Sequence, residues 1–119
     1  DLHDMGDENL AETFGYVARE LGKRGIAYIC AREHEAADSL GPQLKQAFGG
    51  AYIVNESFTK DSANAWLAAG KADAVAFGVP FIANPDLPAR LKADAPLNEA
   101  HPESFYSKGP VGYIDYPAL

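Results

Sequence analysis

The sequence predicts an α/β fold in which short parallel strands alternate with helices. Three apolar runs rich in Val, Ile, Tyr or Phe recur at similar spacing: IAYICA at 26–31, AYIVN at 51–55 and ADAVAFG at 72–78. Stretches with a helical period of apolar residues precede, separate and follow these runs. Strands that alternate with helices in this way imply right-handed crossovers and a parallel sheet.

Composition and charge narrow the class of protein. A chain of 119 residues, 47% hydrophobic and 23% charged, suits one soluble globular domain. The net charge of −7 argues against a nucleic-acid partner, because phosphate binding needs clustered Lys and Arg. No run approaches the roughly 20 apolar residues of a membrane helix, so we expect no membrane partner. The single cysteine, Cys30, excludes an internal disulfide and suits a reducing compartment, so we expect a cytoplasmic protein.

The first helix is predicted before the first apolar run. Four apolar side chains fall on one face of this helix: Leu10, Phe14, Val17 and Leu21. Gly25 is suited to end it. The following run, 26–31, lacks strict polar alternation, as is typical of a strand buried on both faces. Cys30 lies within this run, so we expect a buried, unreactive thiol.

Two further helices are predicted between the strands. An apolar stripe marks the first of them: Leu40, Leu44, Ala47 and Phe48. Ser39 is suited to cap its start, and Gly49-Gly50 is suited to end it. The other helix carries Trp66 on its apolar face, enters at Thr59 and ends at Gly70.

A fourth, shorter helix is predicted after the third strand, within FGVPFIANPDLPARL at 77–91. Asn84 is expected to cap it and Pro85 to take its first position, where a proline loses no needed N–H. The helical period then stops, and the remaining residues are rich in proline and aromatics. We therefore divide one domain into helix and strand units at 1–94 and a tail at 95–119 that wraps onto the protein.

The residues that follow the strands are the candidates for a ligand site, because ligands of parallel α/β sheets sit at the carboxyl ends of the strands. The second and third strands are followed by Asn55, Glu56, Ser57, Gly78 and Val79. Backbone N–H groups at these two ends are suited to hold a phosphate. The alternative is that Gly78 only turns the chain and Asn55 satisfies a loop, and spacing alone leaves both interpretations open.

Other patterns in the sequence give weaker indications of a functional site. His3, His34 and His101 are far apart and form no helical metal pair, so we expect no metal site. The acidic residues near the start lack the glycine and the terminal acid of a calcium loop. No dinucleotide-binding or P-loop glycine pattern occurs.

The later part of the chain resembles a known family. ADAVAFGVPFIANPDLPARL, APLNEAHPESFY and GPVGYIDYPAL resemble the carboxyl-terminal end of the Old Yellow Enzyme family, the flavin-dependent ene-reductases, which include N-ethylmaleimide, xenobiotic and glycerol trinitrate reductases. NLAETFGYVARELGKRG and IAYICARE match more loosely, so the resemblance covers essentially the whole chain. It implies that the chain forms the carboxyl-terminal βα units of a TIM (β/α)8 barrel that binds FMN.

The resemblance also implies roles for particular residues. The candidates Asn55, Glu56, Ser57, Gly78 and Val79 match the positions that hold the FMN phosphate, and Phe105 and Tyr106 match aromatics beside the flavin ring and the substrate. Tyr106 is then a wall of the substrate pocket, with packing of the tail as the alternative. Family members often have Arg in place of Val79 and Gly in place of Glu56 and Ser57. Either the backbone carries the phosphate site here or another basic residue supplies the charge.

The function that the resemblance implies is NAD(P)H-dependent reduction of activated alkenes or nitro compounds through FMN. The family's substrate-binding His pair or His and Asn, its proton-donating Tyr and its Arg near the flavin belong to earlier strands, so we expect no catalytic residue here. A barrel needs about 250 residues, and the sequence begins without Met. We therefore expect an amino-terminal remainder of the barrel as partner, possibly on a separate chain.

Two alternatives remain. One is a noncatalytic half-barrel that binds phosphate ligands or assembles with itself, because two open parallel edges invite pairing. The other is a flavodoxin-like domain, which is disfavoured because its phosphate loop after the first strand is not seen.

Overall fold

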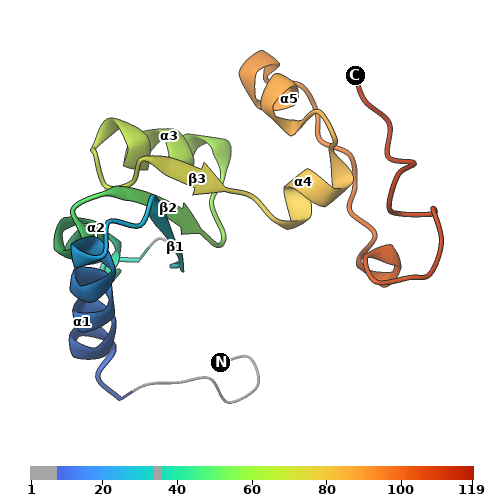
Figure 1. Cartoon of the computed structure of the whole chain (residues 1–119). Coiled ribbons are helices and arrows are strands. Elements are labelled where there is room, and N and C mark those ends of the chain that lie inside the picture. Colours follow the sequence, from blue (N-terminus) through green and yellow to red (C-terminus); the bar gives the residue numbers. More distant parts are fainter. Residues whose placement is uncertain (1–7, 34–35) are drawn as a thin grey trace. The chain divides into compact units, whose positions relative to one another are not determined.

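The computed structural model describes residues 8–33 and 36–119. The elements, in chain order, are α1 (Leu10–Lys23), β1 (Tyr28–Arg32), α2 (Gly41–Phe48), β2 (Ala51–Asn55), α3 (Lys60–Ala68), β3 (Ala74–Ala76), α4 (Val79–Ala83), α5 (Leu87–Ala93) and the short 3-10 helix η2 (Pro102–Ser104) (Figure 1). The chain folds as two compact units that meet between Ala76 and Phe77. None of the described helices is long and apolar enough to cross a membrane.

The first unit is built on a parallel sheet in the order β1-β2-β3. Cys30 is the partner of Ile53, and Ile53 is in turn the partner of Ala74. Two consecutive parallel strands need a crossover connection. α2 lies in the connection between β1 and β2, and α3 lies in the connection between β2 and β3. The predicted α/β fold with a parallel sheet is confirmed.

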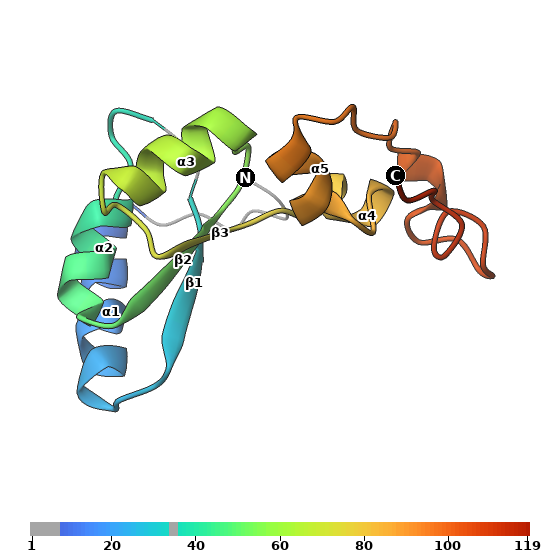
Figure 2. The ribbon, with the colours of Figure 1, turned by 90° about the horizontal axis from the view of Figure 1, so that it is seen from above.

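One face of this sheet is covered by helices. Figure 2 shows α1, α2 and α3 on the same side of the three strands. Tyr52 and Val54 of β2 are completely buried on that side, where Trp66 of α3 is 3% exposed and Phe48 of α2 is 5% exposed. Burial of large apolar side chains between the helices and the sheet is the main stabilising contribution in this unit.

The opposite face of the sheet is uncovered within the first unit. Alternation along the strands places Tyr28, Cys30 and Ile53 on this face. Tyr28 is 56% exposed and Cys30 is exposed. The expectations of strands buried on both faces and of a buried Cys30 thiol are therefore wrong, because none of the helices described in residues 8–33 and 36–76 packs on that side.

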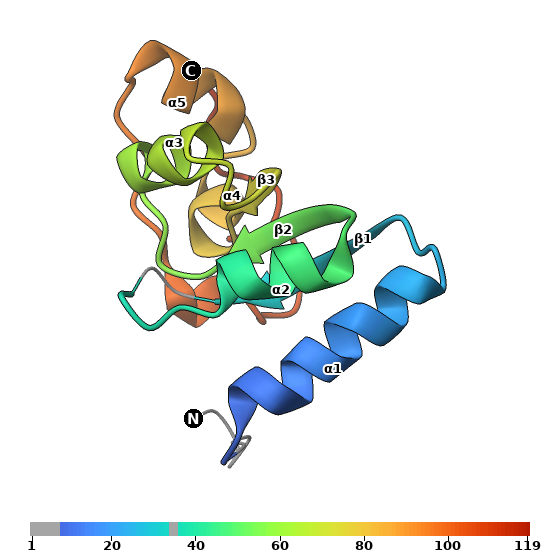
Figure 3. The same ribbon diagram turned by 90° about the vertical axis from the view of Figure 1, so that its left-hand side faces the viewer.

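α1 packs against α2 through a close backbone approach. Figure 3 shows the two helices on the near side of the strands. A Cβ atom added to Gly22 would lie 2.2 Å from the carbonyl oxygen of Phe48, so only glycine permits this contact. The predicted end of α1 is confirmed, because Gly25 follows the helix with a φ of +64°, a conformation that favours glycine.

An open cleft separates α1 from the free edge of β1. It has a volume of about 1150 Å³, and its lining includes the apolar side of α1 with Leu10, Phe14 and Val17. These three side chains are 49%, 46% and 41% exposed. The apolar face that the sequence predicts for this helix therefore lies along the cleft and is only partly covered, and the buried residues of the helix are Gly15 and Ala18.

The ends of α2 and α3 follow the sequence closely. α3 is entered at Thr59, as the sequence predicts, and Thr59 forms a reciprocal capping box with Ser62. Leu40 takes the N-cap position of α2, one residue later than expected, although the Ser39 hydroxyl still accepts a hydrogen bond from the Gly41 N–H. Gly49 ends α2 in the left-handed conformation, with a φ of +73°.

The second unit begins with two short helices, and the prediction for their boundary is wrong. Asn84 lies at the end of α4, and α5 starts at Leu87 rather than at Pro85. The Asn84 amide donates back to the Pro80 carbonyl at 2.8 Å, and its oxygen accepts from the Asn98 N–H at 2.8 Å. Because its side chain bonds in these two directions, Asn84 joins α4 to the tail instead of capping α5.

The tail is irregular apart from η2, as the sequence predicts. It is bound to α5 through Arg90, which is 4% exposed. The Arg90 guanidinium donates to the Asp86 carboxylate at 2.7 Å and to the carbonyls of Pro96 at 2.6 Å and Pro117 at 2.8 Å. The other Asp86 oxygen accepts from the Leu119 N–H at 2.7 Å, so both ends of the tail are bound at one helix.

Candidate functional site

Hydrogen bonds tie together the carboxyl ends of the three strands. The Glu33 N–H, after β1, donates to the Asn55 carbonyl at 2.8 Å. The Asn55 side-chain amide, at the end of β2, donates to the Ala76 carbonyl at 2.7 Å. The Glu33 carboxylate accepts from the Leu40 N–H at 2.9 Å and so holds the segment that leads into α2. This edge of the sheet is therefore an ordered platform of polar groups.

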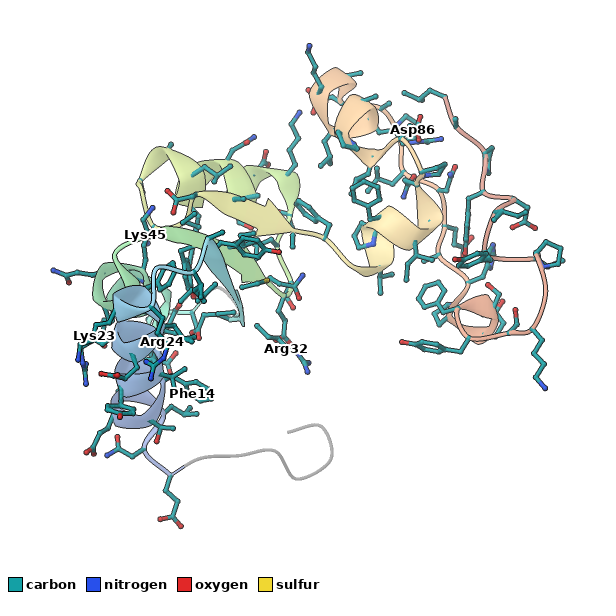
Figure 4. All side chains as sticks on the ribbon, viewed as in Figure 1. Phe14, Lys23, Arg24, Arg32, Lys45 and Asp86 are labelled. Atoms are coloured by element: carbon teal, nitrogen blue, oxygen red, sulfur yellow. The ribbon has the colours of Figure 1, made fainter. Side chains whose placement is uncertain are left out.

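An ion pair joins the ends of β1 and β2. Arg32 Nε lies 2.8 Å from Glu56 Oε2, and Arg32 Nη2 lies 2.9 Å from Glu56 Oε1. Figure 4 shows Arg32 where β1 ends. The hydrogen bonds that Arg32 donates to the Glu56 carboxylate, and then the charge of that carboxylate, raise the pKa of the Arg32 guanidinium. Two parallel N–H···O bonds fix the orientation of both side chains, which a single contact would not do.

The backbone after β2 is strained. Glu56 has a φ of +106° and Ser57 a φ of +59°. Residues with a Cβ atom rarely adopt a positive φ, whereas glycine does so without a steric penalty. Two consecutive residues of this kind therefore turn the chain sharply away from the strand at a cost in conformational energy.

The residues after β3 belong to the second unit. Gly78 precedes α4, and a Cβ atom added to it would meet nothing within 4 Å. Gly78 is exposed, and its φ of −90° lies outside the left-handed region that favours glycine. Val79 begins α4 and is 49% exposed. Open space beside the Gly78 backbone is compatible with the close approach of a ligand.

The aromatic pair of the tail lies after η2. Phe105 is half-buried, whereas Tyr106 is 97% exposed. The alternative for Tyr106 is packing within the tail. Within the described part of the chain, no such packing buries its side chain.

The structure brings some of the predicted site residues together. Asn55, Glu56 and Ser57 form one turn in the first unit, and β-sheet pairing places Asn55 beside Ala76, two residues before Gly78. The other four predicted residues lie in the second unit, which is described by itself. Sequence reasoning missed the contact between Arg32 and Glu56. The predicted parallel pairing of 26–31 with 51–55 could have indicated this contact, because it places Arg32 and Glu56 at the ends of neighbouring strands.

No group of three His, Cys, Asp or Glu residues suited to a metal ion occurs among residues 8–33 and 36–119. His3 and His34 lie outside the described residues. His101 lies 3.6 Å from the Glu103 carboxylate and stacks on Tyr116, with ring centroids 6.2 Å apart. Its described contacts are those of a surface residue within the tail.

The chain is similar to several reductases along its whole length. It is 38% identical to 12-oxophytodienoate reductase 2 from Arabidopsis thaliana, over an alignment of 128 residues that covers 100% of this chain and 34% of that protein. It is 35% identical to a probable flavin mononucleotide-dependent alkene reductase from Leishmania infantum, over 99% of this chain and 33% of that protein. No protein-family model matches the chain.

Solved structures agree with these relatives. The structure of the old yellow enzyme from Trypanosoma cruzi matches 94% of this chain and 31% of its own, with 33% identity and a TM-score of 0.87. This chain is homologous to the Old Yellow Enzymes. Morphinone reductase in complex with tetrahydroNAD matches 100% of this chain and 33% of its own, with 41% identity and a TM-score of 0.91.

The chain spans about a third of the length of these Old Yellow Enzyme relatives. Its three parallel strands are accordingly part of a TIM barrel. In a complete barrel the helices form an outer ring, and the inner faces of the strands pack against one another in the centre. The sheet described here has that arrangement in part: helices cover one face, and the face that carries Tyr28 and Cys30 is open.

The donor groups of the turn after β2 are of the kind that binds an anion such as a phosphate. The Ser57 hydroxyl is exposed, and the Asn55 amide has two N–H bonds, of which one is committed to Ala76. The one acidic side chain in the turn, Glu56, is bound by Arg32 through two hydrogen bonds. Its charge is therefore compensated, so it does not exclude an anion.

Proposed function

We propose that the protein to which this chain belongs is an FMN-dependent NAD(P)H oxidoreductase that reduces activated alkenes or nitro compounds. The observation that carries this proposal is the similarity over the whole chain to reductases, one of them named as an FMN-dependent alkene reductase. In morphinone reductase, the matching chain was solved with the NADH analogue tetrahydroNAD. We expect NADH or NADPH to be the reductant here as well.

We propose that this chain supplies the phosphate side of the flavin site. Its binding residues are Asn55, Glu56, Ser57, Gly78 and Val79. The amide of Asn55, the hydroxyl of Ser57 and the backbone N–H groups of the turn and of Gly78 would donate to phosphate oxygens. Glu56 and Val79 contribute their backbone, because neither side chain is a phosphate donor. Bound FMN would supply the hydride-transfer chemistry.

Phe105 and Tyr106 form the second part of the proposal. They would lie beside the flavin ring, with Tyr106 as a wall of the substrate pocket. The support is the exposure of Tyr106, which is 97% and leaves its ring available for a ligand. A tyrosine offers a flat apolar face together with a hydroxyl, which suits contact with an aromatic cofactor or an enone.

The remainder of the barrel is the expected partner, encoded amino-terminal to this segment or on a separate chain. The open face of the sheet and the free edge of β1 support this expectation, since both leave apolar groups such as Tyr28 without cover in the first unit. We expect that remainder to hold the groups that bind the substrate's activating group and donate a proton, and we assign no catalytic residue to this chain.

The test begins with the native assembly. We would purify the complete protein without a denaturing step, measure its intact mass and visible absorbance, and assay it with NADH, NADPH and a simple cyclic enone. The proposal expects flavin absorbance and reduction of the carbon–carbon double bond. A well-folded complete protein that binds no FMN would refute it.

The alternative is a noncatalytic half-barrel that binds phosphate ligands or assembles with itself. The cleft of about 1150 Å³ beside the free edge of β1 favours it, because an open edge and exposed apolar side chains promote pairing between copies. Sedimentation separates the two functions. A stable, colourless homo-oligomer of this chain favours the half-barrel, whereas a yellow complex with a larger polypeptide favours the reductase.

A further inference from the structure

We propose that Arg32 is a positioning residue for the phosphate of the flavin: it holds the carboxylate of Glu56 and so makes the turn after β2 compatible with an anion. This inference rests on the function proposed above. It concerns only residues of the first unit, and it gives a role to the ion pair between Arg32 and Glu56.

The first step is the geometry of the pair. Both Glu56 carboxylate oxygens accept from Arg32, at 2.8 and 2.9 Å, from two different guanidinium nitrogens. A forked contact of this kind restrains the carboxylate in position and in rotation. Since β1 and β2 are paired from Tyr28 and Ala51 up to Arg32 and Asn55, the guanidinium is presented by a strand that is itself fixed in register.

The second step is the backbone. Glu56 and Ser57 both adopt positive φ, at +106° and +59°, in a turn whose N–H groups are candidates to bind phosphate. Neither residue favours this conformation on its own. A side chain anchored at both oxygens opposes relaxation of the turn, so Arg32 helps to keep the backbone donors in place.

The third step is charge. An unpaired carboxylate within the turn would repel a phosphate that carries up to two negative charges. Arg32 and Glu56 together carry no net charge, although the net charge of the chain is −7. Arg32 is 61% exposed, so it retains contact with solvent while it binds Glu56.

The experiment compares two flavins that differ only in the phosphate. Apoprotein of the complete protein is titrated with FMN and with riboflavin, and binding is followed by flavin fluorescence. Arg32→Gln should weaken FMN binding by about tenfold or more, as for a lost charge-assisted contact. It should change riboflavin binding by less than about twofold, because the phosphate-free ligand does not meet the carboxylate.

A second variant identifies the cause. In the double variant Arg32→Gln with Glu56→Gln, the unpaired acid is removed while the two glutamine amides can still hydrogen-bond to each other and restrain the turn, so FMN binding should recover most of the loss. Arg24→Gln is the matched control, because it removes an exposed arginine that is paired with Glu20 on α1 and causes the same change in charge. The control should leave the binding of both flavins unchanged.

Each outcome decides a different claim. If Arg32→Gln affects neither flavin, or both flavins equally, Arg32 does not position the phosphate site. If FMN binding stays weak in the double variant, Arg32 acts on the phosphate directly rather than through Glu56, and the inference is wrong. A wild-type protein that binds neither FMN nor riboflavin overturns the proposed function and this inference with it.

Discussion

The guanidinium of Arg90 reaches the carbonyl oxygen of Pro117 at 2.8 Å, across 27 residues of sequence. The same group binds Asp86 and the Pro96 carbonyl. A planar fork with five N–H donors can satisfy three acceptors in different directions, which a lysine ammonium on its flexible stem does less well. The start and the end of the tail are therefore bound by one buried side chain.

Replacing this side chain should loosen the tail. Arg90→Met keeps much of the apolar stem but removes the donor of the Pro96 carbonyl, and it leaves the Pro117 carbonyl with the Asn98 amide alone. We expect the free energy of unfolding to fall by about 1–3 kcal/mol for these lost hydrogen bonds. Urea unfolding measures this change, and limited proteolysis with mass analysis should show new cleavage after residue 95.

Arg90→Lys is the matched control, because it retains the charge and loses the fork. We expect it to lie between wild type and Arg90→Met in both measurements. Equal stability of all three proteins would show that the tail is held by other contacts.

Acid should destabilise the first unit through Asp73. Its carboxylate accepts from Lys45 Nζ at 2.7 Å and from the Tyr52 N–H at 2.8 Å, and these bonds, the Lys45 contact first, lower its pKa from the ordinary value of an Asp carboxyl. A carboxyl with a lowered pKa in the folded state contributes stability above its unfolded pKa, and the contribution is lost as pH falls through the folded pKa.

Asp73→Asn should therefore reduce stability at neutral pH. Its stability should also fall less steeply than that of wild type as the pH decreases below about 4. Urea midpoints measured from neutral to acidic pH test this prediction. Lys45→Met, which removes the first cause of the lowered pKa, should give an intermediate slope, and parallel curves for all three proteins would contradict the role of Asp73.

The contact between α1 and α2 should tolerate no side chain at Gly22. A Cβ there would lie 2.2 Å from the Phe48 carbonyl oxygen, which is backbone and cannot rotate away. We expect Gly22→Ala to lower the free energy of unfolding by about 1–3 kcal/mol, as overpacking does.

Gly15 offers a comparison within the same helix. A Cβ at Gly15 meets only the end of the Arg19 side chain, at 3.5 Å. Gly15→Ala should therefore raise the free energy of unfolding by up to about 1 kcal/mol, because alanine favours the helix. Thermal or urea unfolding should show changes of opposite sign in the free energy of unfolding for the two variants if Gly22 lies as close to Phe48 as described. Stabilisation by both variants would show that helix propensity dominates both sites, whereas destabilisation by both would show that Gly15 also lacks room for a methyl group.

The turn at Ser57 should become more stable with glycine. A left-handed residue with a Cβ costs about 1–2 kcal/mol, whereas the extra freedom of glycine in the unfolded chain offsets about 0.5–1 kcal/mol. We expect Ser57→Gly to raise the free energy of unfolding by about 0.5–1 kcal/mol. Ser57→Ala removes the hydroxyl but keeps the Cβ, so it should bring no such gain. A gain with alanine as well would assign the effect to the hydroxyl rather than to φ.

Much of the fold can be predicted from the sequence because local patterns dominate it. Gly25 and Gly49 follow their helices at positive φ, and Thr59 forms its capping box from neighbours within three residues. Parallel pairing follows from the alternation of strands and helices. Asn84 was misassigned because its partners, Pro80 and Asn98, include one that is 14 residues away, which no local pattern reveals.

The candidate site was predictable in part. The position of Asn55, Glu56 and Ser57 at a strand end follows from the length of the second apolar run, and β2 has the expected bounds. The contact between Arg32 and Glu56 depends on the register between β1 and β2, which sequence reasoning did not assign. The exposure of Cys30 was missed because an apolar run predicts a strand but does not show how many of its faces the same chain covers.

The uncovered face of the sheet provides its own reporter. Cys30 is the single cysteine of the sequence, and it is exposed on that face. The rate at which a thiol reagent alkylates this residue therefore measures whether the face is accessible, without any added label. Fast alkylation that becomes slow on addition of a second polypeptide would register the moment at which the interior of the barrel closes.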